Sequence, residues 1–435
     1  MRAVSSWGGL SSPAHDWRAP SDREALHRSV VEAPRPALPF GNGRSYGDAC
    51  LNAGGVLWSM RGLDRLVAFD PSTGVVECEA GATLGEVAEV ALPHGWFLPV
   101  TPGTRFVTVG GAIANDVHGK NHHRAGTFGE HVAWLRLLRT DGSVRDCGPG
   151  TDPEWFRATV GGLGLTGVIE RATVRLTKVA GPWIDAESEP FETLDRFFAL
   201  SAAAEREFAY TVAWVDCGSS GGAEPRGVFF RGNHAASAEP LPAPRRRAVP
   251  IRPARSLIGP TSVALFNRLY RWRHRRPSRG RQSLWSFFYP LDDVLHWNRL
   301  YGRRGFLQHQ SLLPVAAQAE GVRALLKRVA ASGQGSFLAV LKTFGARRPA
   351  GMLSFPAPGT TLAVDVAERG ADTARLFHDL DAIVAAHGGR LYPAKDARMS
   401  AELFRAGYPE WHAFQRFRDP GIASDLSRRL LDPRP

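Results

Sequence analysis

Three separate glycine-rich loops in the first 170 residues constrain this chain of 435 residues more than any other feature. They read "GNGRSYGD" at 41–48, "PGTRFVTVGGAIA" at 102–114 and "GGLGLTG" at 161–167. Glycine lets a backbone approach a ligand closely, and successive backbone N–H groups bind phosphate oxygens. The first loop taken alone is best interpreted as a tight turn, because it lacks the spacing and the following helix of a Rossmann fingerprint. Three such loops in one domain indicate a single long diphosphate ligand, and the backbone amides of the small residues at 108–114 are suited to line an extended phosphate.

Short apolar runs separated by glycine turns dominate the first part of the chain. Residues 83–95 predict an amphipathic helix that ends at Gly95, and Asp141–Gly142 predicts a hairpin turn. A further helix is expected to start with Asp152 as its cap. The expected strands in this part cover 56–60, 65–70, 74–81, 96–100 and 167–179.

The second part of the chain has a different pattern, with strands and long helices. Helices are expected over 320–333 and 371–389, and the end of the chain is expected to be helical and aromatic. The expected strands cover 207–218, 226–232, 305–314, 335–345 and 360–368. Because 435 residues exceed one ordinary core, this pattern predicts an α+β protein with two domains.

The net charge of +12 comes from one segment, residues 245–281. Twelve of the 54 Lys and Arg residues are arginines in this Arg-rich segment, which contains no Asp or Glu. Apolar and aromatic runs such as "VALFNRLYRW" at 263–272 interrupt the arginines. This mixture suits an anionic membrane surface or a lipid phosphate. Nucleic acid and a flexible solvated loop are the alternatives, although no RNA-binding or helix-turn-helix signature accompanies the arginines.

The rest of the sequence indicates an ordinary cytoplasmic protein. No apolar run approaches the roughly 18 residues of a membrane span, and the N-terminus lacks the apolar core of a signal peptide. The cysteines form no CxxC pair, so we expect buried thiols rather than a zinc site or disulfides at Cys50, Cys78, Cys147 and Cys217.

The order of the glycine loops, "HGKNHH" at 118–123 and "RLYPAKDAR" at 390–398 resembles the FAD-binding flavoproteins of the vanillyl-alcohol oxidase (PCMH-type) superfamily. Within it the chain is most similar, over nearly its whole length, to oxidases that act on a prenylphosphoryl ribose. The resemblance implies a two-domain PCMH-type FAD-binding fold. Its expected parts are an FAD domain at 1–180, a substrate domain at 181–389 built on an antiparallel sheet flanked by helices, with the Arg-rich segment inserted, and a C-terminal segment at 390–435 that returns to the FAD domain.

The same resemblance implies which residues hold FAD. His118 would lie against the flavin, and Val168 would contact the cofactor through its backbone. Tyr46 stands where relatives with covalent FAD often carry His, which predicts a non-covalent flavin. The full set of expected cofactor residues is Gly43, Arg44, Ser45, Tyr46, Gly47, Gly103, Thr108, Gly110, Gly111, Ala114, His118, Val168 and Tyr392.

A metal site at His118, His122 and His123 is the alternative interpretation of the histidines. Spacings of four and one do not readily give a tetrahedral set in a loop, and no acidic or Cys cluster supports it. We therefore expect no metal and interpret His122 and His123 as structural. His118 is expected to orient the flavin or bias its redox state, and Lys120 to bind the substrate phosphate.

Lys395 is the expected catalytic residue, together with His118. Oxidation of an alcohol by a flavin requires the hydroxyl proton to leave as the hydride transfers, so a nearby base contributes. Aromatic neighbours such as Tyr392 would lower the pKa of this lysine by desolvation. Without the resemblance, a surface lysine paired with Asp396 would be the preferred interpretation. The substrate residues implied by the resemblance are Lys120, Gln310, Lys342, Asp365 and Lys395.

The resemblance also implies a reaction and its partners. The 2′-hydroxyl of a polyprenylphosphoryl-β-D-ribofuranose would be oxidised to a ketone. An NAD(P)H-dependent keto-sugar reductase would then complete epimerisation to the arabinose donor for cell-wall arabinan. The Arg-rich segment would be a mobile lid or a patch in peripheral contact with an anionic membrane at the inner face of the plasma membrane. No nucleic-acid partner is expected.

Three residues depart from the family pattern. Thr361 and Ala363 stand where relatives carry Asn and Cys, and Asn115 replaces a small thiol-bearing residue. The Cys is not needed for hydride chemistry, whereas loss of the Asn amide affects which sugar is bound. An aldonolactone or alditol oxidase ranks lower, because the covalent His is missing and the Arg-rich segment is present. A scaffold or nucleic-acid-binding protein on a degenerate flavin fold would have no use for intact glycine loops and Lys395.

Overall fold

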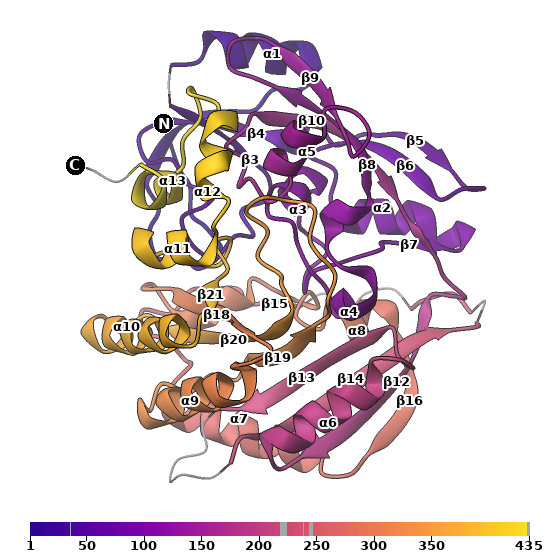
Figure 1. Ribbon diagram of the computed structural model, residues 1–435, viewed down its shortest axis with the longest axis vertical. Helices are drawn as coiled ribbons and strands as arrows, with labels where there is room; N and C mark the ends of the chain where they lie inside the picture. Colours follow the sequence, from indigo (N-terminus) through magenta and orange to yellow (C-terminus); the bar gives the residue numbers. More distant parts are fainter. Residues whose placement is uncertain (35, 218–223, 238, 243–246, 433–435) are drawn as a thin grey trace.

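The computed structural model describes the chain except for residues 35, 218–223, 238, 243–246 and 433–435. Figure 1 shows the N-terminal sheets and the C-terminal helices at one end of the molecule and a large sheet with its own helices at the other. Gly218, at the end of one expected strand, and Arg245 and Arg246 of the Arg-rich segment lie outside the described residues.

A four-stranded sheet in the order β1-β2-β4-β3 begins the fold. Helix α1 (Arg23–Glu32) links β2 to β3, and both of these strands pair in parallel with β4. The sequence predicted only β4, because the other strands are short and lack a clear alternation. The strands are β1 (Arg2–Ala3), β2 (Ala14–Arg18), β3 (Ala37–Phe40) and β4 (Val56–Ser59).

A five-stranded antiparallel sheet follows, in the order β5-β6-β10-β8-β9. Its predicted hairpin is confirmed, with Gly142 in the turn at a φ of 84°. The predicted helix that ends at Gly95 is also confirmed, as α2 (Leu84–Ala91) and a short 3-10 turn. The strands are β5 (Leu66–Asp70), β6 (Val75–Glu79), β8 (Val132–Leu138), β9 (Val144–Cys147) and β10 (Val168–Arg175).

Two local predictions for elements near this sheet are wrong in detail. The strand expected over 96–100 shrinks to β7 (Trp96–Phe97), because Pro99 has no N–H to donate to a neighbouring strand. Helix α5 (Pro153–Thr159) begins where expected, but Asp152 makes no side-chain capping hydrogen bond. Its carboxylate instead faces Arg145 at 3.4 Å.

The large sheet has eight antiparallel strands in the order β16-β12-β14-β13-β19-β20-β18-β21. It contains each of the five strands predicted after residue 205. The strands are β12 (Trp183–Phe191), β13 (Tyr210–Asp216), β14 (Arg226–Ala235), β16 (Ser278–Ser283), β18 (Phe306–Pro314), β19 (Ala339–Phe344), β20 (Gly359–Ala367) and β21 (Arg390–Leu391).

Alternation along the central strands gives this sheet two different faces. One face is apolar and packs against α6 (Leu194–Ala204), α9 (Gln318–Ala331) and α10 (Ala371–Ala386) in a single core. Because strand side chains alternate with a period of two, the residues between the apolar ones point the other way. That second face carries Trp214, Gln308, Gln310, Lys342, Thr361 and Asp365, which line a cavity.

The described part of the Arg-rich segment is folded and is not an unstructured loop. It forms β15 (Arg247–Ala248), helix α7 (Pro260–Arg273) and the edge strand β16. The short helix α8 (Leu284–Phe288) follows directly and packs in the core of the five-stranded sheet. The segment therefore adds both an edge and a covering helix to the large sheet (Figure 1).

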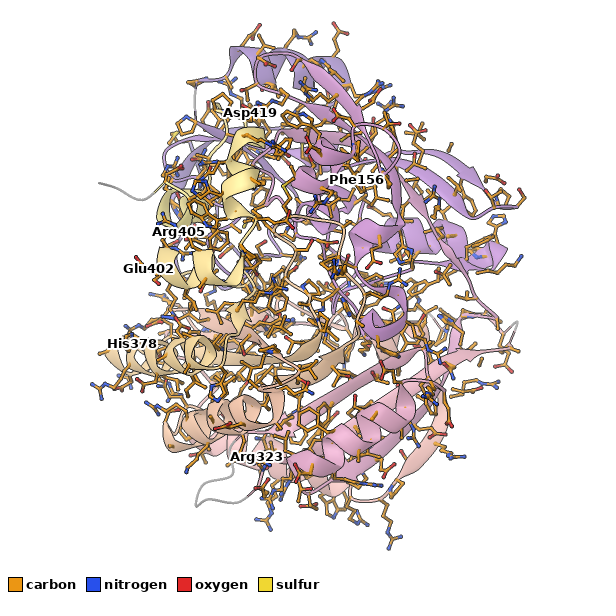
Figure 2. The ribbon with its side chains drawn as sticks, viewed as in Figure 1. Phe156, Arg323, His378, Glu402, Arg405 and Asp419 are labelled. Atoms are coloured by element: carbon orange, nitrogen blue, oxygen red, sulfur yellow. The ribbon has the colours of Figure 1, made fainter. Side chains whose placement is uncertain are left out.

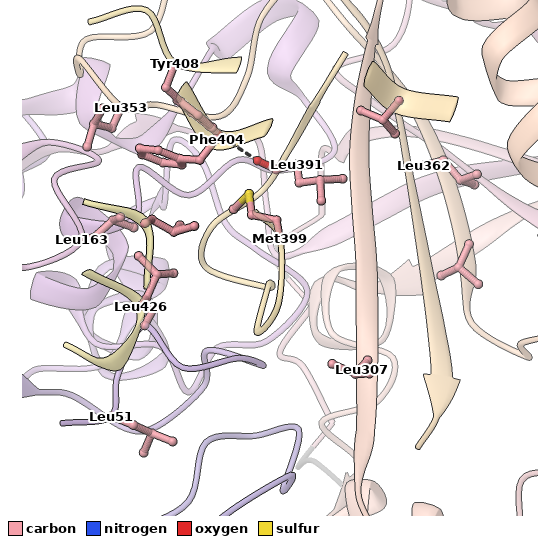
Figure 3. Packing of buried hydrophobic residues seen from close by; sticks show 14 of the residues in the cluster. Leu51, Leu163, Leu307, Leu353, Leu362, Leu391, Met399, Phe404, Tyr408 and Leu426 are labelled. Atoms are coloured by element: carbon pink, nitrogen blue, oxygen red, sulfur yellow. Dashed lines mark hydrogen bonds between the residues drawn. The ribbon is translucent and has the colours of Figure 1, made fainter. Parts of the chain in front are cut away.

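The C-terminal helices pack against the N-terminal part of the chain. Figure 3 shows Phe404 and Leu426 from these helices near Leu163 and Leu51. Asp419, labelled in Figure 2, accepts a 2.8 Å hydrogen bond from the backbone N–H of Thr140. The helices are α11 (Ala401–Gly407), α12 (Trp411–Phe414) and α13 (Asp425–Leu430). The division of the chain at residues 180 and 389 stays a prediction.

Candidate active site

A cavity of about 940 Å³ lies between the glycine loops and the polar face of the large sheet. Nearly all of the cofactor and substrate residues expected from the sequence line it, from Gly43 in the first loop to Lys395 near the C-terminus. Val168 does not line it, although its neighbours Gly167 and Ile169 do. The three residues that depart from the family pattern, Asn115, Thr361 and Ala363, line the same cavity. Residues far apart in sequence therefore meet in one space of the size that ligand sites usually have.

Gly47 also lies outside the cavity lining, and its role is to let two loops meet. A Cβ at this position would lie 1.6 Å from the backbone oxygen of Asp396. The backbone N–H of Tyr46 next to it donates to the carbonyl of Ala394 at 3.2 Å. The first glycine loop therefore packs directly on the loop that carries Lys395.

The small residues of the second glycine loop form a short helix. Helix α3 (Val109–Ala114) is capped by Thr108, whose hydroxyl accepts a 3.2 Å hydrogen bond from the N–H of Gly111. A Cβ on Gly110 would lie 2.9 Å from that of Ala80, so glycine permits the helix to pack on the five-stranded sheet.

His118 is the centre of a polar cluster on the floor of the cavity. Its Nε2 lies 3.0 Å from Nε2 of Gln310, and its Nδ1 lies 3.1 Å from Nζ of Lys342. Its ring also packs edge-on against Phe344, 4.9 Å between ring centroids. Burial, followed by the charge of Lys342, holds the pKa of His118 well below its usual value, so the imidazole is neutral. A neutral imidazole that accepts from Lys342 bears its proton on Nε2, so we infer that the oxygen of the Gln310 amide faces it.

Three lysine side chains line the cavity, and burial lowers the pKa of each of them. Burial lowers the pKa of Lys120 to about 7, and burial with the charges of Lys120 and Lys395 lowers that of Lys342 to about 7. Lys120 donates to the carbonyl of Phe287 and lies 4.5 Å from the centroid of its ring. Two cations with weakened solvation are well suited to bind an anionic group such as a phosphate.

Lys395 lies over the ring of Tyr46, with Nζ 3.7 Å from the centroid. Burial lowers its pKa to about 8, although the charge of Asp365 raises it in part. Burial raises the pKa of Asp365 to about 7, against the hydrogen bond that it accepts from Gln308. The cavity thus holds a basic amine and a carboxyl group that both titrate near neutral pH.

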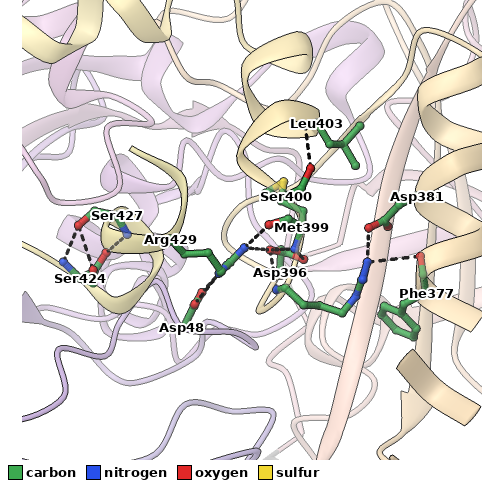
Figure 4. A network of polar contacts seen from close by, with 11 residues as sticks. Asp48, Phe377, Asp381, Asp396, Met399, Ser400, Leu403, Ser424, Ser427 and Arg429 are labelled. Atoms are coloured by element: carbon green, nitrogen blue, oxygen red, sulfur yellow. Dashed lines mark hydrogen bonds and ion pairs between the residues drawn. The ribbon is translucent and has the colours of Figure 1, made fainter. Parts of the chain in front are cut away.

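Asp396 does not pair with Lys395, so the alternative of a surface ion pair is wrong. Its carboxylate accepts from the backbone N–H groups of Arg398 and Met399 at 3.0 and 2.9 Å. It also forms a 3.0 Å ion pair with Arg429, which pairs with Asp48 at 2.9 Å (Figure 4). These contacts fix the loop at its base and leave the amine of Lys395 to the cavity.

The remaining histidines of the "HGKNHH" motif have structural contacts. His122 is buried with its ring centroid 4.4 Å from that of Phe344, and burial lowers its pKa to about 3. His123 bonds to the carbonyl of Phe208 through Nε2 at 2.9 Å. Within the described residues, no group of three or more His, Cys, Asp and Glu side chains is placed to hold a metal ion.

Sequence reasoning missed several residues of the cavity. Gln308 lies directly opposite Asp365 in the β18–β20 register and holds its carboxylate. Trp214 and Tyr270 form an aromatic wall at the far end of the cavity. The alternation of 306–314 contained a signal for Gln308, because it puts Gln308 and Gln310 on the same face. No local signal marks Trp214 or Tyr270, since their position depends on how α7 covers the sheet.

The glycine-loop side of the cavity fits a diphosphate cofactor. Arg44 lies over the ring of Trp7 at 4.3 Å, and its buried Nε has no hydrogen-bond partner among the described residues. Among the described residues, no atom beyond Gly103 and its two chain neighbours lies within 4 Å of a Cβ built there, so the backbone faces open space. A buried donor without a partner beside an open backbone is suited to an anionic ligand. Glycine loops of this kind, opposite a polar sheet face with lysines beside it, define a cofactor-dependent enzyme.

Comparison with known proteins identifies the cofactor. Residues 18–148 match the FAD binding domain family. The chain is 38% identical to decaprenylphosphoryl-β-D-ribose oxidase of Mycolicibacterium smegmatis, over 99% of this chain and 97% of that protein. It is 36% identical to an uncharacterized protein of Streptomyces coelicolor, over 80% of this chain and 99% of that protein. A D-lactate dehydrogenase of Archaeoglobus fulgidus is 30% identical, over only 36% of this chain and 37% of its own length.

The chain belongs to the family of FAD-dependent oxidoreductases that includes the mycobacterial oxidase. The predicted α+β, PCMH-type FAD-binding fold, the FAD cofactor and the oxidoreductase class are confirmed. The similarity to the D-lactate dehydrogenase covers about a third of each chain, whereas the similarity to the mycobacterial oxidase extends through the large sheet.

Proposed function

We propose that this protein oxidises the 2′-hydroxyl of a polyprenylphosphoryl-β-D-ribofuranose to the 2′-keto sugar. The observation that carries the proposal is the convergence of Lys120, Lys342 and Lys395 in one cavity with His118 and the glycine loops. A phosphorylated sugar needs cations for its phosphate and a base for its hydroxyl, and this cavity supplies both. The full-length similarity to an oxidase named for such a substrate supports the same choice.

The residues of the cavity divide the work of the reaction. Bound FAD supplies the acceptor for the hydride. The glycine loops, with Arg44, hold its diphosphate, and Tyr392 and His118 border the flavin. Lys120 and Lys342 bind the substrate phosphate, which raises the local negative charge and keeps these amines protonated.

Lys395 receives the proton of the 2′-hydroxyl as the C–H bond breaks. Its pKa of about 8 leaves a substantial unprotonated fraction at mildly alkaline pH. The charge of Asp365 acts on the Lys395 amine, and its own pKa of about 7 makes its carboxylate a second group in the cavity that can accept a proton. Gln310 and Thr361 share a 3.3 Å hydrogen bond at the position where relatives carry Asn, and they orient the sugar.

The keto product implies a second enzyme. Reduction of the ketone from the opposite face inverts the 2′ centre and gives the arabinose form. We propose that an NAD(P)H-dependent reductase performs this step, so that the two reactions together make the arabinose donor of cell-wall arabinan.

Anaerobic reduction of the flavin tests the reaction directly. Farnesylphosphoryl ribose should bleach the purified yellow protein, whereas free ribose and aldonolactones should not. Bleaching by a lactone or an alditol at a comparable rate would favour the alternative, a soluble-sugar oxidase. A protein that takes up no FAD would contradict both.

We further propose that the Arg-rich segment contacts an anionic membrane. Leu265, Leu269 and Trp272 are exposed by 58%, 55% and 64% and form one stripe on α7 at spacings of four and three. Arg268 and Arg275 flank the stripe and are exposed too. An apolar stripe bordered by arginines suits the interface of anionic lipids, where each arginine contributes about 1 kcal/mol. Every helix in the described ranges is too short or too polar to cross a bilayer.

Vesicle binding tests this contact. The protein should sediment with phosphatidylglycerol vesicles and much less with phosphatidylcholine vesicles, and binding should weaken as salt rises. The double variant Leu269→Ser with Trp272→Ser should lose most of the binding. The matched control is Val315→Ser, which removes an equally exposed apolar side chain outside the Arg-rich segment. Equal sedimentation of both variants with wild type would contradict the contact.

A further inference from the structure

The cavity continues past the polar cluster around His118 into an apolar arm. None of the residue roles proposed for the reaction involves this arm. The arm runs between α7 and the strands β13 and β19 of the large sheet. Its lining comes from the cavity side of those strands, from the two residues before β19 and from one side of the helix: Trp214, Val340, Phe337, Leu338, Phe266 and Tyr270. Val340 lies two residues from Lys342 on the same face of β19, so the arm opens directly from the polar cluster around His118.

Aromatic contacts fix the wall of the arm. The indole N–H of Trp214 donates to the carbonyl of Phe337 at 2.9 Å, so the polar group of this side chain is satisfied. The ring of Tyr270 lies 4.7 Å from that of Trp214, and Phe266 stacks on Tyr270 at 5.6 Å. The side chains therefore present hydrocarbon faces to the space between them.

Helix α7 covers the arm but contributes little to a core. Among its residues only Val263 and Asn267 are buried, and Asn267 donates to Asp216 at 2.8 Å to hold the helix on the sheet. Phe266 and Tyr270 are four residues apart, which puts both on the side of the helix that faces the arm. Helix α7 therefore lies over an apolar space that its own side chains do not fill, which is typical of a binding site, because a structural core would be filled.

The arm reaches the surface beside the exposed stripe. Phe266 is 40% exposed and Arg273 is exposed, and both line the cavity. One end of the arm therefore meets the lysines of the active site, and the other meets the apolar and arginine-rich outer face of α7.

We propose that this arm binds the isoprenoid chain of a prenyl phosphate, with the first isoprene units held under α7. The inference rests on the proposed function and deepens it by assigning a site to the lipid part of the substrate. A sugar phosphate alone needs no aromatic wall, whereas a branched hydrocarbon joined to a phosphate matches an apolar arm that begins at Lys342 and Lys120. The rest of a long chain leaves beside the stripe and stays in the bilayer.

Binding of prenyl phosphates without a sugar tests the arm independently of oxidation. The FAD-loaded protein is titrated calorimetrically with dimethylallyl, geranyl and farnesyl phosphate, one to three isoprene units long. Because each buried methylene contributes substantially to binding, we expect Kd to fall by at least about tenfold from the shortest to the longest ligand. The same Kd for all three ligands would overturn the proposal.

A variant that fills the arm locates the effect. Leu338→Trp should remove most of the gain with chain length while phosphate binding persists. The matched control, Val67→Trp, adds the same ring at an exposed position of β5 outside the cavity and should keep the gain. Retention of the gain by Leu338→Trp would contradict the location. If this variant fails to retain FAD, Phe266→Ser at the half-exposed edge should reduce the gain in the same direction, and an unchanged gain there would contradict it equally.

The two proposals fail in different ways. A dependence of Kd on chain length without bleaching by farnesylphosphoryl ribose would reject the proposed reaction and keep the arm. Bleaching by this substrate with no dependence on chain length would reject the arm and keep the reaction.

Discussion

Lys395 is positioned by contacts that its own side chain does not make. The hydrogen bonds and ion pairs of Asp396 hold the loop, and the close approach of Gly47 to the carbonyl of Asp396 locks it against the first glycine loop. Lys395→Ala should therefore leave the fold intact and lower the rate constant of flavin reduction by about 100-fold to 10,000-fold, the usual contribution of a general base. Anaerobic stopped-flow absorbance measures this constant. Lys327→Ala, at an exposed position of α9, is the control and should reduce at the wild-type rate.

The protonation of Lys395 should govern the pH dependence of the reaction. Only the unprotonated amine accepts a proton, so the rate constant of flavin reduction should rise with pH through about 8 and level off above it. The Asp365 carboxylate raises the pKa of Lys395, because a negative charge stabilises the ammonium form. Asp365→Asn removes that charge and should move the rise to lower pH. Rate–pH profiles of the two proteins measure the shift, and loss of the rise itself in Asp365→Asn would show that Asp365 is the base.

The residue types of the site were predictable from sequence, but their pairings were not. Lys395, His118 and Gln310 were expected in one site, and all three line one cavity. Adjacency in sequence suggested Asp396 as the partner of Lys395, but the Asp396 carboxylate pairs with Arg429 of α13, which is distant in sequence. Gln308 was missed for the same reason, since its role follows from the register between β18 and β20. Pairings of this kind depend on tertiary packing, which no local pattern contains.

At the scale of elements, the glycine loops serve two different purposes, and substitutions should separate them. Gly103 faces open cavity, so Gly103→Ala should leave the melting temperature of the FAD-free protein unchanged and weaken FAD binding. Gly47 faces the carbonyl of Asp396 at contact distance, so Gly47→Ala should destabilise the FAD-free protein by about 1–3 kcal/mol or more through overpacking. Thermal melting of the apoprotein and fluorescence titration with FAD measure the two effects.

Gly150→Ala is the control for both glycine substitutions. In the described part of the chain, a Cβ there meets no atom within 4 Å apart from its chain neighbours, and the residue does not line the cavity. It should change neither the melting temperature nor the affinity for FAD. If Gly103→Ala binds FAD as tightly as Gly150→Ala does, the second loop does not contact the cofactor.

Elements with a strong period or a clear end signal were predictable, and elements defined by their neighbours were not. The helix that ends at Gly95 carries a Thr83–Glu86 capping box and an amphipathic pattern, and it forms as expected. Edge strand β16 has the sequence "SRGRQS", whose residues are almost all exposed, so no burial pattern marks it. Apolar residues of a helix usually face the core, whereas most of those in α7 are exposed. The mixture of arginines and apolar residues in its sequence predicted an unusual surface, but it did not predict a helix at this position.

At the scale of the whole molecule, the cavity lies between the two sheet-containing ends, so FAD binding should stabilise the entire fold. Burial and the charge of Asp365 keep the pKa of Tyr46 well above its usual value, and the phenol stays protonated beneath Lys395. A protonated phenol is a poor nucleophile, which supports the prediction of a non-covalent flavin.

Non-covalent FAD makes stability depend on its concentration. At a free FAD concentration about 100-fold above Kd, binding should stabilise the protein by about 2.7 kcal/mol. Stripping the flavin should therefore lower the melting temperature, and adding FAD should restore it, whereas riboflavin, which lacks the diphosphate, should restore much less. Acid precipitation should release the yellow colour into the supernatant. Flavin retained in the pellet would show a covalent bond, and equal rescue by riboflavin would show that the glycine loops do not hold the diphosphate.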